Sequence, residues 1–373
     1  MYAKGHQLKV VDFFCSGGGM SYGMQQAGIK VIAGIDNDET CKQTYEANIS
    51  GAEFINADVF NLKETDLEEI LSLEKNDDEL ILIGCSPCQF WSIINTDKTK
   101  SYKSRNLLFE FARFVKYFMP GYIIIENVPG VLRRKEESGL SQFIDWLKSN
   151  GYENPHFQVH NVSDYGVAQN RKRFTLIASR VVSQEILLTK RTKRKYTVRD
   201  VLGPENGFPK IDAGHKDTSD FMHTVPSISE VNWRRLQKVE KDGGNRLGFA
   251  KDPDLQLKCF IGKDKSFKDT FGRLWWDKPS IRYTEKFCRN RWSWSIPPKS
   301  SKFFSISNGR FVHPEEDRAL SIREGATLQS FPLTYKFIGT SIAKIARMIG
   351  NAVPPEYAKA IGKAIIQNHT HAV

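Results

Sequence analysis

The chain has 373 residues, which is enough for two domains or for one large and one smaller domain. Its net charge of +11 favours a polyanionic partner, while its apolar and charged fractions are those of a globular protein in water. No apolar run is long enough to span a membrane, the first residues do not resemble a secretion signal, and the six cysteines lack the spacing of a disulfide framework. We therefore expect a cytoplasmic protein that does not bind membranes.

Strands and helices are predicted to alternate along the first half of the chain. Short aliphatic runs predict strands at residues 8–14, 31–35, 54–55, 80–83 and 122–125. Apolar residues at helical spacing predict helices over 20–27, 107–118 and 140–147. This alternation is typical of an α/β fold with a doubly wound, mostly parallel sheet that is covered on both faces.

The pattern changes at about residue 184 and returns to helices at 323–328 and 357–366. Three regions are therefore predicted, over 1–183, 184–317 and 318–373. The middle one, here called the inserted segment, is expected to be a small β-rich domain. Its basic residues lie in a run near its start and among tryptophans near its end; they include Lys190, Arg191, Lys193, Arg194, Lys195, Arg273, Arg289 and Arg291. Such residues favour a nucleic-acid surface, with an ordinary solvated surface as the alternative.

Two cysteines, Cys85 and Cys88, follow the predicted strand 80–83. Loops at the carboxyl ends of strands hold the ligands of open α/β sheets, so a cysteine there is well placed to act as a nucleophile. Pro87 restricts the turn that presents Cys88. The alternatives are a small buried thiol, a thiol–disulfide redox pair, or a zinc site, although the sequence has no second close cysteine pair to complete one.

Six short motifs follow one another in a specific order. They are Asp12–Gly19 (DFFCSGGG), Pro87–Gln89 (PCQ), Glu126–Val128 (ENV), Gln169–Arg173 (QNRKR), Arg323–Gln329 (REGATLQ) and Gly350–Pro355 (GNAVPP). In this order the chain resembles DNA (cytosine-5)-methyltransferases of the bacterial modification type, as found in restriction-modification systems, over nearly its whole length. The resemblance implies an S-adenosylmethionine-dependent methyltransferase fold, in which a target-recognition domain precedes a C-terminal segment that returns to the catalytic domain.

The chemistry of cytosine methylation requires residues of these kinds. Carbon 5 of cytosine becomes reactive when a thiolate attacks carbon 6, and Cys88 suits that role. Ring nitrogen 3 must gain a proton or a strong hydrogen bond, which a carboxyl such as Glu126 can supply. Arg171 and Arg173 are candidates to steady the base carbonyl and the nearby backbone, and the resemblance favours Arg173. The loop 89–104, which begins with Gln89, is expected to close over the DNA.

The methyl donor implied by the resemblance is S-adenosylmethionine, which leaves as S-adenosylhomocysteine; no metal is expected. A glycine-rich turn lets backbone approach such a ligand, and an acidic residue after the next strand can hold ribose hydroxyls. The candidates are Gly17, Gly18, Gly19 and Asp36 and, by resemblance, Phe14, Asp58, Pro87, Asn351 and Val353. Ser16 stands where the family usually has glycine.

We therefore predict a monomeric enzyme that methylates carbon 5 of cytosine in double-stranded DNA at specific sites. It would act through a covalent Cys88 adduct on a flipped-out base, and its DNA would associate it with the nucleoid. One alternative is a catalytically weak DNA-binding protein of the same fold, suggested by Ser16. The other is an RNA cytosine-5 methyltransferase, against which the long inserted segment counts.

Overall fold

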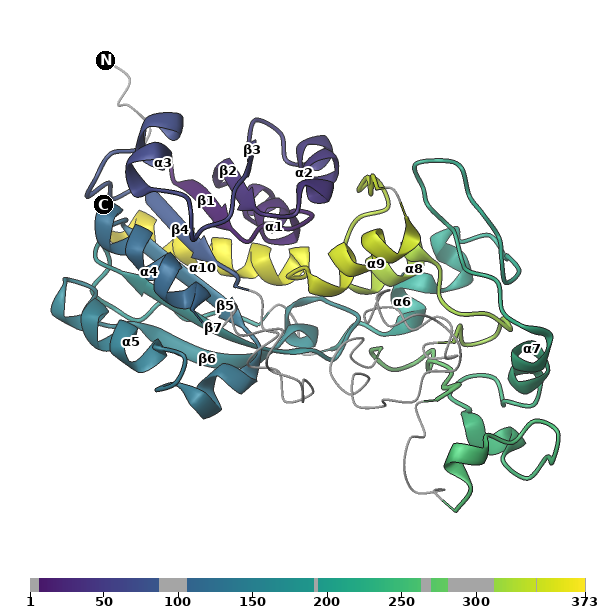
Figure 1. Cartoon of the computed structure of the whole chain (residues 1–373). Coiled ribbons are helices and arrows are strands. Elements are labelled where there is room, and N and C mark those ends of the chain that lie inside the picture. The colour runs from purple at the N-terminus through teal and green to yellow at the C-terminus, as the bar shows by residue number, and fades with distance from the viewer. Residues whose placement is uncertain are drawn as a thin grey trace.

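The computed structural model describes residues 7–86, 106–190, 194–262, 270–280, 312–339 and 341–372. Within them, one seven-stranded sheet has the order β3-β2-β1-β4-β5-β7-β6 (Figure 1). The strands are β1 (Lys9–Phe13), β2 (Lys30–Asp36), β3 (Glu53–Asn56), β4 (Leu80–Gly84), β5 (Tyr122–Asn127), β6 (His156–Asn161) and β7 (Lys172–Ser179). The first five strands are parallel, and β7 runs antiparallel to both β5 and β6.

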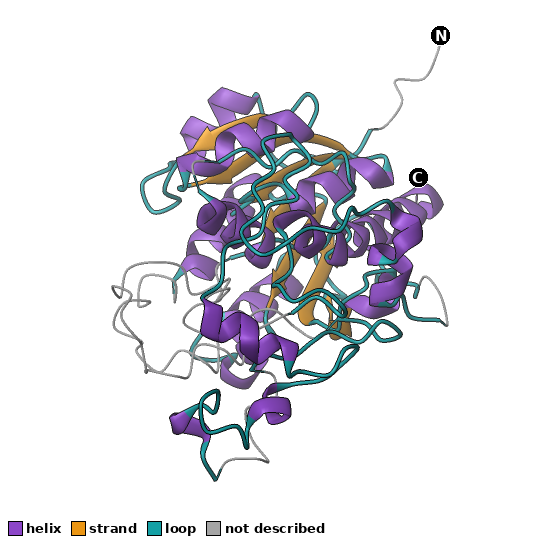
Figure 2. Cartoon of the chain, turned by 90° about the vertical axis from the view of Figure 1, so that its right-hand side faces the viewer, coloured by secondary structure: helices purple, strands orange, loops and turns teal. Residues whose placement is uncertain are grey.

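Helices cover both faces of this sheet (Figure 2). The helices of the described residues, not all of which lie on the sheet, are α1 (Gly19–Ala27), α2 (Lys42–Asn48), α3 (Glu64–Leu71), α4 (Leu107–Phe118), α5 (Leu140–Ser149), α6 (Val198–Leu202), α7 (Glu230–Gln237), α8 (Ile322–Leu328), α9 (Ile342–Asn351) and α10 (Pro355–Ala372). None of the helices in the described ranges is both long and apolar enough to cross a membrane. The mostly parallel α/β fold predicted from the sequence is confirmed.

The strands alternate their side chains between two apolar cores. Val10, Ile81 and Ile124 face the core beneath α1, α2 and α10, whereas Val11 and Leu82 face the core beneath α3, α4 and α5. Because both faces are buried, the central strands read as continuous aliphatic runs, which is why they were predictable.

The predicted strands and helices all occur, but several elements were not predicted. Outside the inserted segment these are β6, β7, α2, α3 and α9. Strand β6 lies at the edge of the sheet and leaves Phe157 and Gln158 exposed, so its sequence lacks an aliphatic run. Helices α2 and α3 bury few side chains, and their apolar stripe is correspondingly weak.

The described part of the inserted segment is not β-rich. It contains the helices α6 and α7, short 3₁₀ turns over Pro204–Asn206, Arg246–Phe249 and Lys258–Phe260, and isolated bridges such as Arg273 to Val312. The expected strands do not occur among these described residues. Turns and side-chain hydrogen bonds to the backbone provide the order there instead.

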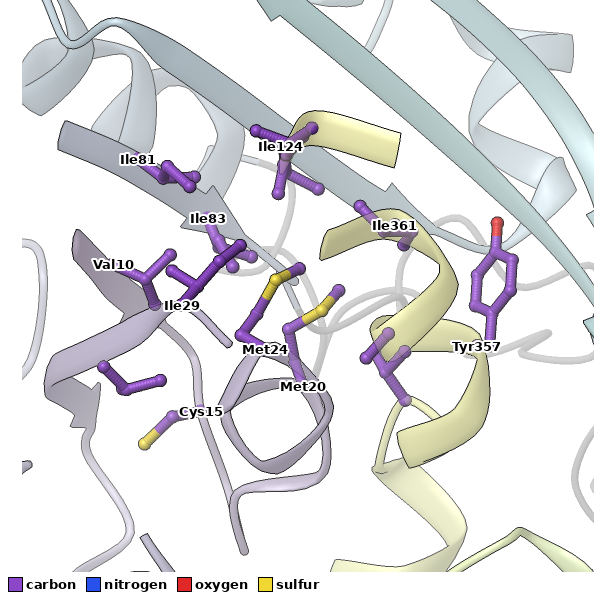
Figure 3. Close-up of a cluster of buried hydrophobic side chains, with 14 of the residues drawn as sticks. Val10, Cys15, Met20, Met24, Ile29, Ile81, Ile83, Ile124, Tyr357 and Ile361 are labelled. Carbon is purple, nitrogen blue, oxygen red and sulfur yellow. The ribbon is translucent and has the colours of Figure 1, made fainter. Parts of the chain in front are cut away.

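Helix α10 lies beside α1 on one face of the sheet, although about 330 residues separate them in sequence (Figure 1). Figure 3 shows Met20 and Met24 of α1 beside Ile361 of α10, over strand residues that include Ile124. The two backbones approach closely at Gly23, where an added Cβ would lie 2.4 Å from both the Ala358 Cβ and the Pro355 carbonyl oxygen.

We predict that Gly23→Ala destabilises the protein by about 1–3 kcal/mol, because the new methyl group overlaps α10. In an isolated helix, replacing glycine with alanine would stabilise the helix by about 1 kcal/mol. The contact with α10 therefore reverses the expected effect on the free energy of unfolding. Urea unfolding measures the difference, and Gln26→Ala at an exposed position of α1 is the matched control. A Gly23→Ala protein as stable as the wild type would show that the helices can separate without cost.

Candidate active site

The parallel strands β1 to β5 all end at one edge of the sheet, and most of the predicted site residues gather there. Asp36 ends β2, Glu126 and Asn127 end β5, and Cys85 follows β4. Asp58 follows β3 at the same edge and accepts a hydrogen bond from the Phe60 amide. This is the position at which open α/β sheets bind ligands.

The loop after β4 is held from β5 by Asn127. Its side-chain amide donates to the Ser86 carbonyl oxygen at 3.2 Å and lies 3.1 Å from the Ser86 Oγ. The other end of the same side chain accepts the Val128 amide at 2.8 Å, which fixes its orientation. Ser86 is two residues before Cys88. The predicted Pro87, Cys88 and Gln89 themselves lie outside the described residues.

Glu126 forms a buried ion pair with Arg173. The Arg173 Nε lies 2.7 Å from the Glu126 Oε1, and both side chains are less than 10% exposed. The pairing of β5 with β7 brings them together, since Glu126 is opposite Thr175, and Arg173 points to the same face two residues away. Burying one of these charges alone would be costly, so each holds the other in place. The two predicted residues therefore form one unit.

Arg171 has a different partner. Its guanidinium donates to the Gln329 Oε1, and the Gln329 amide donates in turn to the Ile349 carbonyl oxygen at 2.9 Å. This side chain therefore links the loop before β7 with the segment after α8 and with α9. Gln329 stands in a motif noted in the sequence, but its connection to Arg171 was not predicted.

The glycine-rich loop, residues 14–19, joins β1 to α1 in a tight conformation. Phe14 and Ser16 have φ values of 64° and 48°, in the left-handed region that favours glycine, as does Gly18 at 88°. The Asp36 carboxylate holds the loop by accepting the Ser16 amide at 2.9 Å, and burial raises the pKa of this carboxyl. Asp36 therefore connects the end of β2 to the glycine-rich loop.

The end of α9 and the start of α10 cover the other side of this loop. At Gly19 an added Cβ would lie 2.4 Å from the Val353 carbonyl oxygen, so glycine is required there. At Gly17 an added Cβ would lie 3.4 Å from the Met348 Cβ of α9, so a side chain there would meet α9 without overlap. Val353 is buried, and Asn351 is exposed at the end of α9. The first and last predicted motifs therefore meet in space.

Burial raises the pKa of two titratable groups beneath the loop. Burial, with the nearby Asp12 and Glu126 carboxylates, raises the pKa of the Cys85 thiol well above its usual range, which does not fit a reactive redox thiol. Burial also raises the pKa of Asp12 to about 7. Asp12 accepts a hydrogen bond from Ser21 at 2.6 Å, and Ser21 contacts the Tyr45 hydroxyl at 2.9 Å. This network was not predicted, because nothing in the sequence pairs its members.

The two ends of the basic run, Lys190 and Lys195, lie close to the segment between β6 and β7. Lys190 and Lys195 both pair with Asp164, at 3.8 Å and 3.5 Å, and Arg194 pairs with Asp200. These cations are largely exposed, and surface pairs of this kind are weak. Arg191, Lys193, Arg289 and Arg291 lie outside the described residues.

Arg273 is not available as the DNA contact that the sequence predicted. Its side chain is 0% exposed. It donates to backbone carbonyl oxygens, including those of Leu236 at 3.0 Å and His313 at 3.0 Å, and it pairs with the Asp317 carboxylate. The prediction was wrong because a sequence pattern does not distinguish an arginine that orders a loop from one that faces solvent.

We predict that Ser16→Gly raises the free energy of unfolding by about 0.5–1 kcal/mol, because glycine accepts the left-handed conformation of this position without strain. Ser16→Ala is the matched control, since it removes the hydroxyl but keeps the strain. Thermal and urea unfolding of the three proteins measure the effect. Equal stabilisation by alanine would show that the hydroxyl, and not the backbone, is responsible.

Comparison with known proteins agrees with this geometry. Residues 8–367 match the C-5 cytosine-specific DNA methylase family. The chain is 35% identical over 361 residues to the Type II methylase M.HgiDII of Herpetosiphon aurantiacus, covering 95% of this chain and 94% of that protein. It is 29% identical over 367 residues to the Type II methyltransferase M1.HphI of Haemophilus parahaemolyticus, covering 98% and 88%.

Solved structures share the fold. A DNA modification methyltransferase encoded within an E. coli prophage superposes with a TM-score of 0.70 at 20% identity, covering 97% of this chain and 99% of that one. The sheet order and the helices on both faces are thus those of an α/β methyltransferase fold. From the family match and the 35% identical relative, the chain belongs to the C-5 cytosine-specific DNA methylase family.

Proposed function

We propose that this protein transfers a methyl group from S-adenosylmethionine to carbon 5 of a cytosine flipped out of double-stranded DNA, through a covalent bond to Cys88. The observation that carries the proposal is the buried Glu126–Arg173 pair, adjacent to Asn127, which anchors Ser86 just before the nucleophile. Glu126 lies at the end of β5, the parallel neighbour of β4, and Cys88 follows β4 in sequence by four residues.

The residues of the glycine-rich loop fit the methyl donor. The Asp36 carboxylate supplies acceptors for ribose hydroxyls at the end of β2, and it is oriented by the Ser16 and Asp38 amides at 2.9 Å each. Phe14 is held in the left-handed region beside it, and its ring can lie against an adenine. Asp58, Pro87, Asn351 and Val353 complete the proposed site, together with Gly17, Gly18 and Gly19. When bound, S-adenosylmethionine supplies an electrophilic methyl group.

The residues of the chain carry the remaining chemistry. The Cys88 thiolate forms a bond to carbon 6 while Glu126, in its protonated form, donates that proton to nitrogen 3, which makes carbon 5 electron-rich. Arg173 steadies the base carbonyl and keeps Glu126 oriented, and Arg171 holds the loop before β7 through Gln329. After carbon 5 has been methylated, its proton passes to water, the carbon 6–sulfur bond breaks and releases the Cys88 thiolate, and nitrogen 3 returns its proton to Glu126.

The inserted segment, residues 184–317, is proposed to recognise the target sequence. Residues 1–183 are proposed to form the catalytic domain, and residues 318–373 to return to it. Lys190, Arg194 and Lys195 would contact phosphates, exchanging Asp164 and Asp200 for DNA, and Arg191 and Lys193 would contribute to the same phosphate contacts. Gln89, Arg289 and Arg291 would also contact the duplex. We propose that the enzyme acts as a monomer in the cytoplasm, associated with the nucleoid through DNA. Methyl transfer to duplex DNA, RNA or neither separates this function from the two alternatives.

Cys88→Ser is expected to abolish methylation while leaving duplex binding largely intact, because the thiolate forms the covalent bond and other residues hold the DNA. Duplex DNA with 5-fluorocytosine at the target is expected to become covalently bound to the wild type, since fluorine cannot leave as a proton does. Denaturing electrophoresis measures the adduct, and Cys85→Ser is the matched control that should keep forming it. A Cys88→Ser protein that still methylates would exclude the covalent mechanism.

Glu126→Gln is expected to slow the chemical step by roughly two to four orders of magnitude, the usual effect of removing a general acid. The glutamine oxygen can still accept from Arg173, so DNA binding should change much less. Single-turnover methylation and duplex affinity, measured on the same preparation, separate the two effects. Turnover at the wild-type rate would remove Glu126 from the mechanism.

A further inference from the structure

Tyr335 contacts the glycine-rich loop from the segment after α8. Its side chain is fully buried, and its hydroxyl donates to the Gly17 carbonyl oxygen. The ring packs against Phe331 at 4.7 Å and Tyr22 at 5.2 Å between centroids, so it has little freedom to move. An added Cβ at Gly18 would lie 2.9 Å from the same hydroxyl oxygen. Tyr335 therefore lies directly against the backbone of the loop.

Two side chains of α2 form hydrogen bonds with the backbone of the residues after Tyr335. Asn48 accepts the Lys336 amide at 2.8 Å and donates to the Lys336 carbonyl at 2.7 Å. Thr44 accepts the Ile338 amide and donates to the Ile338 carbonyl, both at 2.9 Å. One turn of α2 thus pairs with alternate residues of an extended segment, as a neighbouring strand would. Tyr335 is held in register with the helix that follows Asp36.

The backbone of Tyr335 is held from the other side by Arg323. This buried guanidinium donates to the carbonyl oxygens of Tyr335 at 2.9 Å and Pro332 at 3.3 Å. It also donates to those of Asp220 at 3.1 Å and Phe221 at 2.6 Å, which belong to the inserted segment. The residue that touches the glycine-rich loop is therefore fixed through a single arginine to the inserted segment.

We propose that Tyr335 is a positioning residue that holds the backbone of the glycine-rich loop in the conformation that binds the methyl donor. The inference rests on the proposed function, because the loop is taken as the binding site for S-adenosylmethionine. The loop contains two non-glycine residues in the left-handed region, and such a conformation persists when surrounding contacts impose it. The hydroxyl of Tyr335 supplies one such contact at the centre of the loop, on the carbonyl of Gly17.

The test is Tyr335→Phe, which keeps the ring and removes the hydroxyl. Leaving the buried Gly17 carbonyl without its donor is expected to weaken S-adenosylmethionine binding by roughly fivefold to a hundredfold. The turnover at saturating donor and the affinity for duplex DNA without donor are expected to stay close to the wild type, because the loss falls on donor binding. Calorimetric titration of the full chain with S-adenosylmethionine measures the affinity.

Tyr152→Phe is the matched control. The Tyr152 hydroxyl is also buried and donates to a backbone carbonyl, that of Pro120 at 2.6 Å, at the opposite edge of the sheet. Both variants should lose similar stability in urea, but Tyr152→Phe should keep the wild-type affinity for the donor. Equal donor affinities in the three proteins, or equal weakening in both variants, would overturn the role of Tyr335. A parallel loss of duplex affinity in Tyr335→Phe would also overturn it, while a wild type that binds no donor would overturn the proposed function and this inference together.

Discussion

The contact between α1 and α10 is the constraint on which the site depends. At Gly23 the two backbones lie so close that one added methyl group would overlap α10. One turn earlier, Gly19 leaves room for the Val353 carbonyl oxygen. Because α1 begins at the glycine-rich loop and α10 begins just after Val353, their packing sets both walls of the proposed donor site. Segments more than 300 residues apart thereby act as one structural unit.

Buried arginines provide the second level of order. Arg173 pairs with Glu126, Arg171 reaches Gln329, and Arg318 pairs with Glu324 at 2.7 Å. Buried ion pairs contribute little net stability but are directional, and removing one partner is costly. They therefore determine how loops are oriented around the sheet, whereas the aliphatic cores on its two faces supply most of the driving force for folding.

The inserted segment is built differently from the sheet. Its described part has short helices and turns. Arg273, within the segment, and Arg323, outside it, both donate hydrogen bonds to backbone carbonyl oxygens of the segment. A long side chain with several donors can satisfy several carbonyls at once, so irregular backbone becomes ordered without strands. Under the proposed function, such an arrangement leaves surface side chains free to vary with the DNA sequence that is read, while Arg323 keeps the segment attached to the region proposed to be catalytic.

The sequence alone determined the α/β class, the central strands, the order of the motifs and the choice of Glu126 and Arg173 as separate candidates. Those features depend on local periodicity or on short motifs, which the chain carries in adjacent residues. The Glu126–Arg173 ion pair, the partners of Arg171 and Tyr335, the raised pKa of Asp12 and the burial of Arg273 were decided by the tertiary structure. Each depends on contacts between residues distant in sequence, and desolvation or hydrogen bonding across such contacts leaves no local pattern to read.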